Sequence, residues 1–133
     1  MPPEFRKAES SDVRGIHALI SHYASNGKLL PRSVYDVRRN LSKFFVAIEG
    51  AVVVGCVCLD VYGKKMAEIR SLAVAEHARG QGIGQQLVKL CVNEAKRRHV
   101  LEVMAITSVD HFFKSSGFDY TLPGERKALF INP

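Results

Sequence analysis

Residues 79–84, RGQGIG, have the residue types and spacing to bind an anion. A strand-like run ending in LAV precedes them, and an amphipathic, helix-like run follows. The amino terminus of a helix leaves about four backbone N–H groups unpaired and carries roughly half a positive charge. Gly80, Gly82 and Gly84 have no side chains to keep a ligand from these donors, and Arg79 adds a fixed cation. The segment therefore indicates a nucleotide phosphate site, another anion site, or a turn that holds no ligand.

Two familiar nucleotide motifs do not fit this loop. A P-loop reads G-x-x-x-x-G-K-[ST], and no Lys-Ser or Lys-Thr pair follows these glycines. The dinucleotide motif G-x-G-x-x-G would need a glycine at position 85, which is Gln85. An isolated G-x-G-x-G is weak support for any ligand, so the flanking elements must decide.

A carboxylate lies in the predicted strand that leads to the loop. Glu68 begins an alternation with Arg70, Leu72 and Val74, which places all four side chains on one face unless a bulge interrupts the strand. A carboxylate beside a bound substrate can act as a general base. The alternative is that Glu68 only pairs with Arg70 or a nearby lysine.

The hydrophobic pattern predicts a mixed α/β domain over residues 1–133 in the order β-α-α-β-β-β-α-β-α-β-β. Strand pairing is expected to be mostly antiparallel before residue 75, with a parallel crossover after it. Ser33 can cap the second helix, and Gly117 can end the last one. The expected elements are a strand within 3–9, a helix over 10–25, a short helix from 33, two strands within 43–63, a strand over 66–74, a helix over 82–99, a strand over 101–107, a short helix over 108–116, and strands over 118–122 and 126–131.

The charge balance is basic but dispersed. The 133 residues carry a formal net charge of +6. Cations lie side by side only in short runs, at 6–7, 38–39, 64–65, 96–98 and 126–127, and no RNA-binding aromatic motif accompanies them. A solvated basic surface, or attraction to an anionic small ligand, is therefore favoured over nucleic-acid binding. No run approaches the roughly 18 apolar residues that a membrane helix needs.

The cysteines and histidines do not indicate a metal site. Cys56, Cys58 and Cys91 form an odd set without C-x-x-C spacing, and the histidines are scattered. Cys56 and Cys58 lie two apart in a strand-like run, so they are expected on one face as buried free thiols. No apolar signal region opens the chain, so a reducing, cytoplasmic setting is expected.

The glycine loop in its context resembles the acetyl-CoA motif of the GNAT superfamily of N-acetyltransferases, [QR]-x-x-G-x-[GA]. Arg79, Gly82 and Gly84 occupy its defining positions. FFKSSGF at 112–118 resembles a second motif of that family, an aromatic pair before Gly-Phe. The order of elements is also similar to the GNAT fold over nearly the whole chain.

This resemblance implies acetyl-CoA as cosubstrate and a set of site residues. Glu68 would be the base, and the backbone N–H of Val74 would donate to the thioester carbonyl. Many members carry tyrosine as a general acid where this chain has Phe113, so solvent or a hydroxyl such as Thr107, Ser115 or Tyr120 would protonate the thiolate. The residues implied to contact acetyl-CoA are Leu72, Ala73, Val74, Arg79, Gly80, Gln81, Gly82, Ile83, Gly84, Gln85, His111 and Phe113.

A further resemblance reduces the range of amines expected to accept the acetyl group. The segments GKLLPRS, AEIRSLAV and ITSVDHFFKSSGF are similar to the acetyltransferase part of N-acetylglutamate synthases, an arginine-biosynthesis family. By that resemblance Arg32 would bind a substrate carboxylate, and Arg70 could add charge. The alternatives are another amino acid, a polyamine-like or protein amine, and a non-catalytic acetyl-CoA-binding module. A homodimer is expected by analogy with the superfamily.

Overall fold

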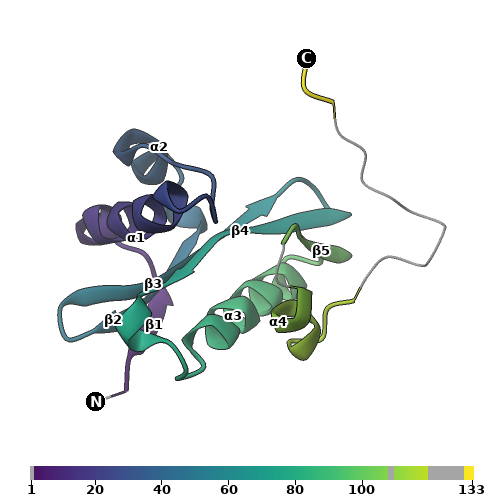
Figure 1. The fold of residues 1–133 in the computed structure, drawn as a ribbon. Coiled ribbons are helices and arrows are strands. Elements are labelled where there is room, and N and C mark those ends of the chain that lie inside the picture. Colours follow the sequence, from purple (N-terminus) through teal and green to yellow (C-terminus); the bar gives the residue numbers. More distant parts are fainter. Residues whose placement is uncertain (1, 108–109, 120–130) are drawn as a thin grey trace.

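The computed structural model describes residues 2–107, 110–119 and 131–133. A five-stranded sheet in the order β1-β2-β3-β4-β5 forms the middle layer. Helices α1 and α2 cover one face of the sheet, and α3 and α4 lie on the other (Figure 1). The result is an α+β fold with a mixed sheet.

The observed elements follow the predicted order as far as residue 115. The strands are β1 (Glu4–Lys7), β2 (Phe44–Glu49), β3 (Val52–Val61), β4 (Met66–Val74) and β5 (Glu102–Ala105). The helices are α1 (Val13–Ser25), α2 (Val34–Arg39), α3 (Ile83–Arg97) and α4 (Asp110–Ser115), with short 3-10 turns at Ser10–Asp12, Leu41–Lys43 and Glu76–Ala78. Nearly all of the two expected closing strands lies outside the described residues, and Phe118 and Asp119 are not in a strand.

Two expected helix boundaries are confirmed by hydrogen bonds. The Ser33 hydroxyl accepts a bond from the Asp36 N–H at 3.0 Å and so caps α2. Gly117 has φ 94°, and its N–H bonds the Lys114 carbonyl just after α4. The first helix begins later than expected, because Ser10–Asp12 forms a 3-10 turn and the Asp12 carboxylate accepts the Glu9 N–H.

The sheet separates two apolar cores. On the α1 side, Ile16 and Ile20 are fully buried and pack in a cluster with Cys56 and Cys58. On the α3 side, the buried stripe of that helix packs on the opposite face of the strands; its members are Ile83, Leu87, Val88, Cys91 and Ala95. Each fully buried aliphatic side chain contributes roughly 1.5–3 kcal/mol, so these stripes fix both helices on the sheet.

The sheet opens between β4 and β5. The first three strand pairs are antiparallel, whereas β4 and β5 are parallel and joined by the α3 crossover, as predicted. Their pairing runs from Met66 opposite Glu102 to Ile69 opposite Ala105. In the described part of the chain, β4 thus continues to Val74 without this neighbour, which leaves its edge open.

A bulge in β4 overturns one expectation. Arg70 lies opposite Cys58 and Ala73 opposite Cys56, so two residues of β4 face the single residue Val57. The side chains therefore change faces: Arg70 shares the α1 face with Cys58, whereas Leu72 packs in the α3 core. The expectation that Glu68, Arg70, Leu72 and Val74 share one face is wrong, because the extra residue shifts the alternation.

A metal cluster and a membrane-spanning helix are both absent from the described residues. Within them, His, Cys, Asp and Glu side chains form no group of three or more that could hold a metal ion. No helix in residues 2–107, 110–119 and 131–133 is long and apolar enough to cross a membrane.

Candidate active site

An open cavity of about 1210 Å³ lies at the start of α3, beside the open edge of β4. It receives residues from both faces of the sheet, because the bulge turns the two halves of β4 in opposite directions. The lining consists of Tyr23, 28–30, Arg32, 68–74, 78–80, 82–85, Ile106, Thr107, Phe112 and Phe113. Most of the predicted site residues therefore come together; Gln81 and His111 do not belong to this lining.

The glycine loop forms one end of the cavity. Gly80 and Gly82 have φ values of 80° and 77°, which residues with a side chain rarely adopt. Gly82 is the N-cap of α3, and the first helical bond runs from Gln86 N–H to its carbonyl. The N–H groups of the first turn before Gln86 therefore have no partner within the helix and are directed as an anion site requires.

Gly84 differs from the other two glycines. A Cβ at this position would meet the Phe112 ring at 3.2 Å, so Gly84 lets α4 pack closely against the start of α3. Phe112 and Phe113 meet edge to face with ring centroids 5.1 Å apart, and Phe113 meets Phe118 at 5.4 Å. The aromatic motif thus forms a wall of the cavity, and Phe113 carries no proton to donate.

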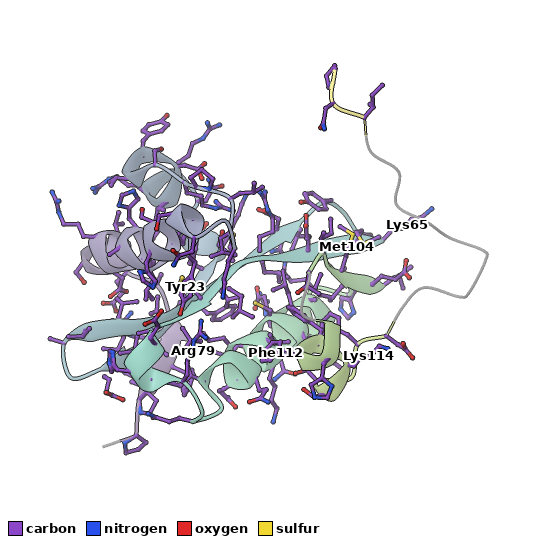
Figure 2. The ribbon with its side chains drawn as sticks, in the orientation of Figure 1. Tyr23, Lys65, Arg79, Met104, Phe112 and Lys114 are labelled. Atoms are coloured by element: carbon purple, nitrogen blue, oxygen red, sulfur yellow. The ribbon has the colours of Figure 1, made fainter. Side chains whose placement is uncertain are left out.

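Tyr23 connects the glycine loop to β4, and no site role was predicted for it from the sequence pattern. Its hydroxyl donates to the Val74 carbonyl and accepts from Arg79 Nη2 at 2.8 Å. The Arg79 guanidinium also lies 5.3 Å from the Tyr23 ring centroid (Figure 2). The sequence did contain a signal for this contact, because a tyrosine at the end of a buried apolar stripe needs a hydrogen-bond partner for its hydroxyl.

Replacing Tyr23 with phenylalanine is expected to lower the free energy of unfolding by about 1–2 kcal/mol, because the Val74 carbonyl and Arg79 both lose a bond. The affinity for acetyl-CoA, the cosubstrate that the sequence resemblance implies, should fall about 5-fold because Arg79 loses its orientation. Urea unfolding and calorimetry measure these two effects. Tyr35→Phe is the matched control, since Tyr35 is 70% exposed on α2 and should change neither value. Equal stability and equal acetyl-CoA affinity of Tyr23→Phe and Tyr35→Phe would show that the bonds of Tyr23 to Val74 and Arg79 have no role.

Glu68 lies on the α1 face of β4, where it lines the cavity. The Tyr62 hydroxyl donates to Glu68 Oε1 at 2.5 Å, and Asp60 is the residue opposite on β3. Desolvation and the bond to Glu68 together raise the pKa of Tyr62 to about 12, so this hydroxyl remains protonated. Glu68 is thus held by a neutral donor rather than by a salt bridge, although Arg70 is on the same face.

Asp60 pairs with cations at the end of the cavity that contains Arg32, Glu68 and Arg70; because these residues are predicted to serve the acceptor, this part is called the acceptor end. The Asp60 carboxylate is buried within an apolar strand, and it lies 3.2 Å from Arg70 Nη1, 3.4 Å from Lys43 Nζ and 4.0 Å from Arg32 Nη2. Burial disfavours the charged guanidinium, but the bond and charge of Asp60 still raise the pKa of Arg70. An acidic residue in the run CVCLDV signals such a site, because a buried carboxylate needs cationic partners.

The two predicted substrate-binding arginines differ in exposure. The Arg70 side chain is 37% exposed, whereas that of Arg32 is 8% exposed. Arg32 donates to Ser71 Oγ at 2.9 Å and to Asp36 Oδ2 at 3.0 Å, and its guanidinium lies over the Phe44 ring. Arg70 therefore presents more of its charge to the cavity.

An anion-binding helix terminus, an open strand edge and a carboxylate within one cavity suit the transfer of an acyl group from coenzyme A to an amine. Fold and site together define an acetyl-CoA-dependent N-acetyltransferase. The chain belongs to the acetyltransferase (GNAT) family, whose model matches residues 13–118.

Similar proteins agree with this assignment. The chain is 38% identical over 113 residues to an uncharacterized N-acetyltransferase of Chlorobaculum tepidum, covering 85% of this chain and 73% of that protein. It is 33% identical over 120 residues to an amino-acid acetyltransferase of Mycobacterium tuberculosis, covering 87% and 68%. The longer amino-acid acetyltransferase of Ralstonia nicotianae is 30% identical over 131 residues, but the chain spans only 29% of its length.

Solved structures show the same fold. Rv2747 of Mycobacterium tuberculosis, in complex with CoA and NLQ, has a TM-score of 0.85 at 30% identity, over 95% of this chain and 77% of that one. N-acetylglutamate synthase of Neisseria gonorrhoeae, complexed with coenzyme A and N-acetyl-glutamate, also has a TM-score of 0.85, at 26% identity. That match covers 93% of this chain and 30% of the synthase.

Proposed function

We propose that this enzyme acetylates the α-amino group of an acidic amino acid, glutamate, as in the first steps of arginine biosynthesis. The supporting observation is the charge of the acceptor end, where Lys28, Arg32 and Arg70 line the cavity together with Glu68. Cations suit the carboxylates of such a substrate, and the Glu68 carboxylate suits its ammonium group. Relatives named amino-acid acetyltransferases and a synthase bound to N-acetyl-glutamate support the same choice.

In the proposed mechanism Glu68 accepts a proton from the ammonium group, directly or through water, because only the neutral amine attacks. Acetyl-CoA supplies the thioester from which the acetyl group leaves. The Ala75 N–H bonds the Val54 carbonyl, so alternation directs the Val74 N–H away from β3 and toward the open edge. We assign this N–H to the carbonyl oxygen of the acetyl group, where negative charge develops.

Acetyl-CoA is proposed to bind along the part of the cavity that β4, the glycine loop and α4 form. The β4 backbone at Leu72, Ala73 and Val74 would bond the pantetheine arm, and residues 79–85 would surround the pyrophosphate. Phe113 and His111 of α4 would flank the thiol end. Among the hydroxyls considered as proton donors to the thiolate, Thr107 lines the cavity, Ser115 donates to the Phe112 carbonyl, and Tyr120 lies outside the described residues.

The test is release of free CoA thiol with a panel of amines: glutamate, its uncharged isostere glutamine, ornithine, spermidine and a lysine peptide. Glutamate is expected to give the highest kcat/KM, and glutamine a lower one. The protein's own thiols should not interfere, because burial raises the pKa of Cys56 and Cys91 to about 12 and of Cys58 to about 11. A faster reaction with spermidine or the lysine peptide would refute the proposed acceptor.

A second candidate function is an acetyl-CoA-binding module without catalysis. Phe113, in place of a tyrosine that can donate a proton, is the observation in its favour. Tight binding of acetyl-CoA with no thiol release for any amine would support it. We also propose that residues 1–133 form a single domain, that the protein is a homodimer and that it is cytoplasmic. These proposals apply to both candidate functions.

A further inference from the structure

Ser71 adopts an unusual backbone conformation in the middle of β4. Its φ is 55°, in the left-handed region that a residue with a side chain enters only at a cost. It is also the first of the two residues that face Val57 across the bulge. A strand without this conformation would keep a regular alternation.

The side chains of β4 change faces at Ser71. Before it, Glu68 and Arg70 lie on the α1 face with the buried Asp60. After it, Leu72 and Val74 pack in the α3 core, next to the glycine loop. The residues assigned above to the acceptor and to acetyl-CoA therefore lie before and after Ser71 in one strand, on opposite faces.

Arg32 is the side chain that holds Ser71 from the α2 side. Its Nε donates to Ser71 Oγ at 2.9 Å, while Nη1 is paired with Asp36 in the first turn of α2. The side chain is 8% exposed and stacks on the fully buried Phe44. On the backbone side, the Ser71 carbonyl accepts the Cys56 thiol at 3.4 Å. A nearly buried arginine with three fixed neighbours is suited to hold a conformation as well as to supply charge.

We propose that Arg32 is a positioning residue that holds Ser71 in the left-handed conformation, and so keeps the acceptor and acetyl-CoA halves of β4 on opposite faces. This inference goes beyond the proposed function, because it applies whichever amine is acetylated. It also makes a prediction that a purely electrostatic role for Arg32 does not make. Glycine adopts positive φ without help, so Ser71→Gly should remove the need for Arg32.

The test is a double-mutant cycle of Arg32→Lys, which keeps the charge, with Ser71→Gly. With Ser71 present, Arg32→Lys is expected to lower kcat about 10-fold and to raise KM for both substrates, in line with the cost of the left-handed region. In the Ser71→Gly background the same change should cost less than about 2-fold. Ser71→Ala should be less active than Ser71→Gly, because alanine loses the bond and keeps the strain.

Nuclear magnetic resonance provides a readout independent of turnover. The Cα and Cβ shifts of Ser71 should show positive φ in the wild type and lose that signature in Arg32→Lys. Arg6→Lys is the matched control, since Arg6 is part-buried, bonds Asp12 at 2.7 Å and does not line the cavity. Its effect should be small and unchanged by Ser71→Gly.

Three results would overturn the proposal: equal costs of Arg32→Lys in both backgrounds, an effect confined to the acceptor KM, or an unchanged Ser71 signature. If Arg32→Lys fails to fold, equal activities of Ser71→Ala and Ser71→Gly would overturn it. If the wild type acetylates no amine, the proposed function fails separately. The same cycle is then read from the calorimetric affinity for CoA, with the same expected rescue.

Discussion

Gly82→Val is expected to weaken acetyl-CoA binding by at least about 100-fold, close to 3 kcal/mol of binding free energy. Gly82 is the N-cap of α3 at φ 77°, and the protein itself leaves room for a Cβ, whose only described neighbour within 4 Å is Gln85 Oε1 at 3.6 Å. A valine would therefore obstruct the ligand rather than the core, and it would move the N–H donors by disfavouring positive φ. Isothermal calorimetry with acetyl-CoA measures the effect.

The matched control for this variant is Gly50→Val. Gly50 has φ 64°, has open space around its Cβ position, and lies in the turn between β2 and β3, away from the cavity. A valine at this position has the same cost of positive φ, roughly 1–2 kcal/mol, but it does not contact the anion site. Both variants should keep the circular dichroism spectrum of the wild type. An acetyl-CoA affinity for Gly82→Val equal to that of Gly50→Val would reject the assigned pyrophosphate site.

Glu68→Gln is expected to lower kcat by about 100-fold and to leave acetyl-CoA affinity within a factor of two. The amide has the shape of the carboxylate and can still accept the Tyr62 hydroxyl bond, but it cannot take a proton from the substrate ammonium. The loss should therefore appear in turnover rather than in folding. Steady-state thiol release at neutral pH, together with calorimetry, separates the two effects.

Glu49→Gln is the control for the change in charge. Glu49 ends β2, outside the cavity, and its replacement should leave kcat close to the wild-type value. Turnover by Glu68→Gln at the same rate as Glu49→Gln would remove Glu68 from the role of base. The binding-module interpretation would then depend on whether the wild type itself releases thiol.

Local patterns predicted the elements and the anion site. The apolar stripe of α3 and the glycines before it specify a helix and its exposed amino terminus within about 20 residues of sequence. The order of strands and helices followed in the same way, because each element carries its own periodicity and capping residues. The aromatic wall at Phe112 and Phe113 was likewise visible as a short motif.

The contacts between distant parts of the site could be found only from the tertiary structure. Tyr23 meets Arg79 and Val74 from more than 50 residues away in sequence, and Arg32 meets Ser71 from 39 residues away. Asp60 pairs with Lys43, Arg70 and Arg32 only because the residues on either side of α2 lie against β3 and β4. These contacts join residues that are far apart in the chain, so no periodic pattern in the sequence predicts them.

At the bulge around Ser71, local sequence patterns predict the strand but do not predict its change of face. Neighbouring residues were enough to place Glu68, Arg70, Leu72 and Val74 in one strand, because alternation and β propensity are local properties. The change of face at Ser71 depends on how β4 packs against the rest of the protein. The physical reason is that a serine at positive φ is unfavourable in isolation, and it is held there by the pairing with β3 and by the side chain of Arg32.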